Sequence, residues 1–71
     1  MMPDNAKAIS ELMMSFGKQV DAILIRVRDT ESESEQRRIA RMMSHVLVAM
    51  LTEVMNPIYE EYPDLRPQEL Q

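Results

Sequence analysis

The stretch "MMSHVLVAMLTEVMNPIYEEYP", residues 42 to 63, decides the fold, because it is far more apolar than one helix-helix contact requires. It holds four of the chain's eight methionines. At helical spacing its apolar residues form two adjacent stripes that together cover roughly 200° of a helix, whereas one neighbouring helix covers a much narrower arc. We therefore expect this helix to touch two neighbours. The first stripe contains Ile39, Met43, Val46 and Met50, and the second contains Leu47, Leu51, Val54 and Ile58.

An earlier amphipathic segment predicts a first helix over residues 5 to 28, capped by Asp4 or Asn5. Its apolar residues occupy an arc of roughly 120°, the width of a helix that rests on one partner. Gly17 lies at the edge of this arc, where it either admits a close backbone approach or is a tolerated helix glycine that costs about 1 kcal/mol. The apolar residues of this first helix recur at alternating intervals of four and three, which is the spacing of a heptad seam. The seam consists of Ile9, Met13, Phe16, Val20, Ile23 and Val27.

The first helix should stop at "RDTESESEQ", residues 28 to 36, where two S/T-x-x-E capping boxes overlap. Thr30 with Glu33 forms one box and Ser32 with Glu35 forms the other, so the register of the second helix is ambiguous by two residues. We place that helix at residues 34 to 55. A connection this short folds the two helices back on each other as an antiparallel hairpin.

Asn56-Pro57 interrupts the second helix, because proline lacks an amide donor and its ring clashes with the carbonyl of residue 53. The helix should kink, or restart with Asn56 as its cap and continue as a short extension over residues 57 to 62. The tail, residues 63 to 71, contains two prolines, and Leu65 and Leu70 are its only apolar anchors. It predicts an ordered turn at Pro63-Asp64 followed by a frayed end.

The chain has 71 residues and no cysteine, so it is at most one domain and its stability must come from packing. A lone hairpin of this length buries little surface, and small domains without disulfides or metals often oligomerise. We therefore expect an all-α single domain, a helical hairpin that pairs with a second copy as a homodimeric four-helix bundle. The expected dimer interface consists of Met43, Leu47, Met50, Leu51, Val54 and Ile58.

Three further features are candidates for contacts with partners. Glu53 interrupts the first stripe, and a carboxylate there either turns to water or pairs with a cation across the bundle and fixes its register. Met14 and Ile25 share an angular position on the side of the first helix that is opposite its seam. Together with Tyr59 and Tyr62 of the extension, they form the expected surface for a protein partner.

Nothing in the sequence predicts catalysis or a cofactor. His45 is the only histidine, and it has neither a second histidine nor paired carboxylates at helical spacing, so we expect no enzyme activity, catalytic residue, metal site or cofactor. The longest apolar run, Val46 to Leu51, is far shorter than the roughly 20 residues of a membrane span, and the start of the chain does not resemble a secretory signal. A cytoplasmic location without membrane contact is expected.

The sequence therefore favours a non-enzymatic interaction or regulatory module that acts as a homodimer and binds an unidentified protein. One alternative is a small regulator that binds nucleic acid through Arg37, Arg38 and Arg41, duplicated across the dimer. The net charge of -4 and the acidic tail disfavour nucleic acid as a partner. In the other alternative, the chain is a structural subunit whose second stripe meets a different protein.

Overall fold

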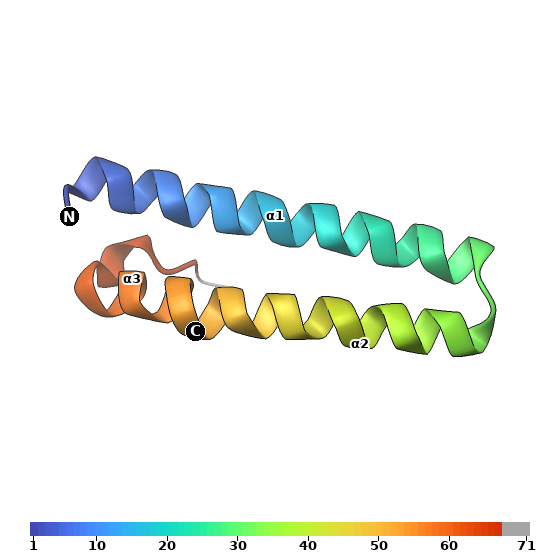
Figure 1. The fold of residues 1–71 in the computed structure, drawn as a ribbon. Helices are drawn as coiled ribbons and strands as arrows, with labels where there is room; N and C mark the ends of the chain where they lie inside the picture. Colours follow the sequence, from blue (N-terminus) through green and yellow to red (C-terminus); the bar gives the residue numbers. More distant parts are fainter. Residues whose placement is uncertain (68–71) are drawn as a thin grey trace.

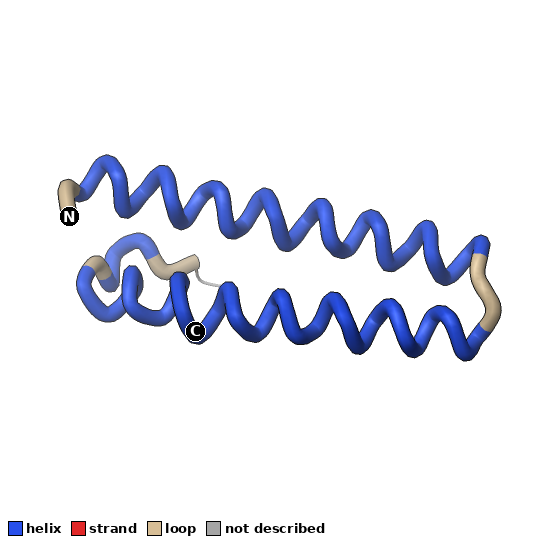
Figure 2. Tube along the Cα trace, viewed as in Figure 1, coloured by secondary structure: helices blue, strands red, loops and turns tan. Residues whose placement is uncertain are grey.

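The computed structural model describes residues 1–67 and shows two long helices folded back on each other (Figure 1). Helix α1 is Pro3–Thr30 and helix α2 is Glu33–Ala49. The helical path continues without a break through a π-helical segment η1 (Met50–Met55) and helix α3 (Asn56–Glu61), and the non-helical Tyr62 then separates α3 from a 3-10 turn η2 (Pro63–Leu65). No strand occurs among the described residues (Figure 2). This confirms the expected all-helical class and the hairpin; Leu70 and the expected frayed end lie outside the described residues.

Helix α1 begins earlier than predicted. Its cap is Met2, in an extended conformation with φ -73° and ψ 142°, and Pro3 is its first helical residue. The amides of Asn5 and Ala6 donate to the carbonyl of Met2 at 3.0 and 3.1 Å. The prediction of Asp4 or Asn5 as the cap is therefore wrong: proline suits the first helical position because that position has no intrahelical amide bond to lose.

Helix α2 uses the second of the two overlapping capping boxes. The amide of Glu35 donates to the side-chain oxygen of Ser32 at 3.3 Å, while Thr30 ends α1 with its hydroxyl bound to a carbonyl of the preceding turn. Across the connection, the side-chain amide of Gln36 donates to the carbonyl of Arg28 at 3.1 Å. This bond ties the first turn of α2 to the last turn of α1 and sets which residues of the two helices lie level.

Pro57 does not interrupt the helical path, because the turn before it is widened. Asn56 has helical φ and ψ of -61° and -47° and caps nothing; its amide donates to the carbonyl of Leu51, five residues earlier. A π-helical turn of this kind accommodates the proline ring and its missing amide within a continuous helix. The short third helix is thus observed, but the prediction that Asn56 caps it is wrong.

The core lies at the open end of the hairpin, where α3 meets the start of α1. It consists of Ala6, Met55, Ile58 and Tyr59. There the hydroxyls of Ser10 and Tyr59 form a buried hydrogen bond of 2.7 Å between residues 49 positions apart. Elsewhere along the described hairpin, Val20 is the only buried hydrophobic residue. The middle of the hairpin is consequently held by Val20 and by half-buried contacts.

Replacing Tyr59 with phenylalanine should lower the free energy of unfolding by about 1–2 kcal/mol, because the buried hydroxyl of Ser10 loses its partner. Urea denaturation followed by circular dichroism at fixed protein concentration measures this change. The double variant Tyr59→Phe/Ser10→Ala is the control and should recover part of the loss, since neither polar group then remains. Equal stability of Tyr59→Phe and the parent would contradict the role of the bond.

Gly17→Ala should stabilise the chain by up to about 1 kcal/mol, the difference in helix propensity. A methyl group at this position would meet no atom within 4 Å, so no close backbone approach requires the glycine. An increase in the thermal midpoint at fixed protein concentration is expected. A decrease would show that the glycine is needed for an approach that lies outside the protomer.

Candidate interaction surface

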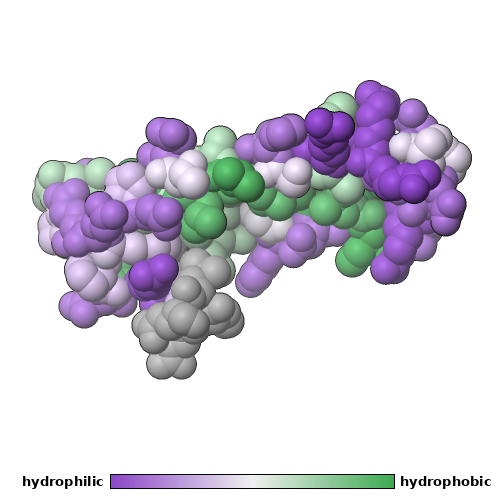
Figure 3. All heavy atoms as spheres, turned by 90° about the horizontal axis from the view of Figure 1, so that it is seen from below, coloured by the Kyte–Doolittle hydropathy of each residue, from purple (hydrophilic) through white to green (hydrophobic). Residues whose placement is uncertain are grey.

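Five large hydrophobic side chains on one broad side of the hairpin are exposed. Figure 3 views the molecule from below, onto its α2 edge, where hydrophobic residues continue along the middle of the rod between hydrophilic margins. Ten large hydrophobic residues are exposed among residues 1–67. We use the name apolar face for the set that shares one side of the two long helices. Its members are Leu12, Phe16 and Ile23 of α1 and Met42 and Val46 of α2.

Helix geometry places these five residues on the same side. Residues advance by about 100° each around an α-helix, so the buried and half-buried positions of each helix mark the direction of the other helix. The exposed members lie about 80–90° from that direction, in the same rotational sense on both helices. Two antiparallel helices are related by a local twofold axis perpendicular to the plane that contains both helix axes. Rotation about this axis keeps each broad side of the hairpin in place, so side chains with equal angular offsets in the same rotational sense on the two helices lie on the same broad side. The five side chains therefore form a single surface.

The central part of the apolar face carries no charge. At the same angular positions between its members lie Gln19 and Ala49, both uncharged. Charges stand only at its two ends, with Arg26 and Arg38 near the helix connection and Glu53 on η1. An uncharged apolar centre with charged margins has the composition typical of the middle of a protein-protein interface.

Arg38 is held by Glu35 at the connection end of the face. Its Nη2 donates to a carboxylate oxygen of Glu35 at 2.9 Å and its Nε to the other at 3.1 Å. These hydrogen bonds, and then the guanidinium charge, lower the pKa of the Glu35 carboxyl below its ordinary value. Both groups are in contact with solvent, so the pair orients the guanidinium more than it stabilises the fold.

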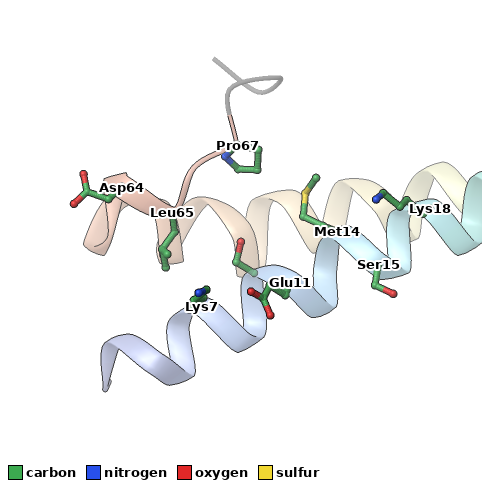
Figure 4. Close-up of a pocket in the computed structure, with 9 residues that line it drawn as sticks. Lys7, Glu11, Met14, Ser15, Lys18, Asp64, Leu65 and Pro67 are labelled. Atoms are coloured by element: carbon green, nitrogen blue, oxygen red, sulfur yellow. The ribbon is translucent and has the colours of Figure 1, made fainter.

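The opposite broad side of the hairpin is partly covered by the C-terminal segment. Leu65 and Pro67 approach the α1 side chains from this segment and, with them, line an open groove (Figure 4). Leu65 and Met14 also pack against the core cluster. Residues 1–67 thus cover one broad side of the hairpin near the open end and leave the apolar face uncovered. The groove is lined by Lys7, Ser10, Glu11, Met14, Ser15, Lys18, Asp64, Leu65 and Pro67.

The residues expected in the dimer interface mostly face α1 inside the protomer. Ile58 is buried in the core with 6% exposure, so it is removed from the expected interface. Leu51, with 41% exposure, is the one member that remains open to solvent, and it lies on the side opposite the apolar face. Helix α2 does expose more apolar surface than its contact with α1 requires, but the exposed side chains are those of Met42 and Val46. The remaining expected members are half-buried: Met43, Leu47, Met50 and Val54.

The expected partner surface is also divided. Tyr59 packs in the core and is removed from it, because its side chain has only 5% exposure. The half-buried Tyr62 donates its hydroxyl to the carbonyl of Met1. Met14 is half-buried beside the groove, whereas Ile25 is exposed. Of these four residues, Ile25 alone is open to a partner.

The drift of a straight helix explains why sequence reasoning missed Phe16 and Ile23 as surface residues. A heptad seam moves by about 20° per heptad around an ideal α-helix unless the helices supercoil. The members Ile9, Phe16 and Ile23 follow one another at heptad spacing, and they change from half-buried to exposed in that order. The arc of roughly 120° given by the sequence includes this drift, but it does not tell which of its residues lie at the exposed edge.

The remaining polar candidates do not assemble into a chemical site. His45 is exposed on α2, and no group of three His, Cys, Asp or Glu residues within residues 1–67 is placed to hold a metal ion. Across the described helices, none is both long and apolar enough to cross a membrane. Of the three arginines that start α2, Arg38 is committed to Glu35, which reduces the positive charge of that patch.

Comparison with known proteins finds no relative: no protein-family model matches the chain, and no curated protein or solved structure matches it significantly.

Ile58→Ala and Leu51→Ala form a matched test of how deeply these two side chains are buried in the protomer. Ile58→Ala should lower the free energy of unfolding by about 2–4 kcal/mol, because it opens a cavity in the core. Leu51→Ala should cost less than about 1 kcal/mol, because the side chain is already partly hydrated. Chemical denaturation at fixed protein concentration compares them. Similar losses for the two variants would mean that Leu51 is as covered as Ile58.

Proposed function

We propose that this chain is a non-enzymatic protein-interaction module that acts as a homodimer, with the apolar face as the surface on which the two copies meet. The observation that carries the proposal is the gathering of Leu12, Phe16, Ile23, Met42 and Val46 on one uncharged side of the hairpin.

The accessible surface of the protomer supports this proposal. It amounts to 5577 Å² for a mass of 8.3 kDa, whereas a compact folded chain of that mass exposes about 4,600 Å². The radius of gyration is 14.4 Å, against about 11 Å for a compact domain of this length. The hairpin thus exposes about 1,000 Å² more than a self-sufficient domain, and pairing would remove surface of that order.

The size of the broad side is also suited to a stable dimer. The chain extends over 44 × 20 × 17 Å, so a broad side that runs the length of the rod leaves room for an interface of the usual size, which buries about 800 Å² on each partner. A face-to-face contact would give each of α1 and α2 the second neighbour that its apolar circumference requires.

A matched pair of substitutions on α2 tests the proposal. Val46, 43% exposed, lies in the apolar face, and Val48, 58% exposed, lies on the outer side of the same helix. The parent chain should sediment as a dimer at tens of micromolar. Val46→Glu should sediment as a folded monomer, because a charge would be buried at the centre of the interface. Val48→Glu should remain dimeric.

Circular dichroism confirms that each variant is helical before its mass is compared. A parent chain that is monomeric at this concentration overturns the homodimer. Identical masses for the two glutamate variants would show that the copies meet elsewhere than on the apolar face.

A further inference from the structure

We propose that the two copies pack on their apolar faces in antiparallel orientation, so that Glu53 of each copy forms an ion pair with Arg38 of the partner subunit. The inference rests on the homodimer proposed above and adds the orientation of the copies and the residues that select it.

The contact at the helix connection shows which residues of α1 and α2 lie at the same height along the rod, which we call level. The hydrogen bond from Gln36 to the carbonyl of Arg28 places these two residues side by side. Both helices rise by about 1.5 Å per residue in opposite directions. The point midway between Gly17 and Lys18 of α1 is therefore level with the point midway between Val46 and Leu47 on α2, which is one residue, or about 1.5 Å, from the midpoint between His45 and Val46.

Eight positions on and beside the apolar face form four pairs about this common level, while Val46, the remaining member of the face, lies next to the level itself. On α1 the midpoint of each pair falls between Gly17 and Lys18, and on α2 it falls between His45 and Val46. Consider a twofold axis that lies in the plane of the interface and crosses the helices at a right angle at this level. It places each residue of a pair opposite the other member of that pair in the second copy. The pairs are Leu12 with Ile23, Phe16 with Gln19, Met42 with Ala49, and Arg38 with Glu53.

This axis brings together side chains of suitable chemistry. Leu12 meets Ile23 of the partner subunit, and the long side chain of Met42 meets the small Ala49 of the partner subunit. Glu53, which has no ion pair within residues 1–67, meets Arg38 of the partner subunit. Both ends of the face then carry a paired charge, and the centre stays apolar.

The guanidinium of Arg38 has a nitrogen available for this second carboxylate. Its Nε and Nη2 hold Glu35, while Nη1 is directed to the sulfur of Met42 at 3.7 Å. Met42 belongs to the apolar face, so Nη1 stands at the margin of the surface on which the second copy would pack. An arginine offers five donors, enough for two carboxylates.

The parallel arrangement is disfavoured by charge. A twofold axis along the helices would place α2 on α1 of the partner subunit, at equal levels along the rod. Arg38 is level with Arg26, as the alignment of Gln36 with Arg28 requires. Like charges would then approach each other at the connection end of both copies, and Glu53 would gain no cation there.

Charge reversal tests the ion pair. Glu53→Arg and Arg38→Glu should each raise the dissociation constant of the dimer at least about tenfold, since both symmetry-related pairs become repulsive. The double variant Glu53→Arg/Arg38→Glu should return to within about threefold of the parent, and an equimolar mixture of the single variants should form a heterodimer. Glu60→Arg, on α3 and outside the face, is the control and should leave the constant unchanged. A double variant no tighter than the singles would overturn the pair.

Cysteine cross-linking tests the orientation independently, because the chain has no cysteine of its own. Leu12→Cys and Ile23→Cys should each resist oxidative dimerisation alone, since each position faces the other on the partner subunit. An equimolar mixture should form a disulfide-linked dimer, because a disulfide needs Cα atoms within about 7 Å. A dimeric chain whose mixture fails to cross-link overturns the antiparallel orientation and leaves the homodimer standing. A monomeric parent chain overturns both.

Discussion

Two helices that pack only against each other can each bury one stripe of side chains, and this constraint governs the whole molecule. Where a third element is present, at the open end, α3 and the C-terminal segment complete a small core around Ala6 and Tyr59. Where no third element is present, in the middle of the hairpin, Val20 is the single buried hydrophobic among the described residues. The distribution of burial follows directly from the number of neighbours that each turn of helix has.

Sequence patterns predicted the helices because their signals are local. The capping boxes, the short connection and the amphipathic spacing each act over a few residues, so helix existence and antiparallel direction could be read in advance. The choice of Ser32 over Thr30 as the cap of α2 could not, because both capping boxes fit the sequence. The first cap could not, since Pro3 and Asp4 offer competing signals and the steric suitability of proline prevails. Asn56 was misplaced as a cap because a π-helical turn relieves the proline without ending the helix.

The candidate surface was harder to predict than the helices, since it depends on small angles that accumulate along them. Phe16 and Ile23 belong to the seam by spacing but leave it by angle, because a straight helix drifts relative to the heptad. Conversely, Leu47 and Val54 belong to the second stripe by spacing but turn toward α1. The total apolar surplus depends on composition and could be anticipated. Its position depends on the local twist of both helices, which the sequence pattern does not record.

The uneven core also bears on how folding and association would be related. The open end holds a buried hydrogen bond between Ser10 and Tyr59 and is complete within one protomer, so it can order without a partner. The middle of the hairpin lacks such contacts, and its stability would come from the second copy in the proposed dimer. Binding that favours the folded state stabilises it by mass action. Association would thus rigidify the part of the hairpin that presents the apolar face, while the α3 end keeps its structure regardless of concentration.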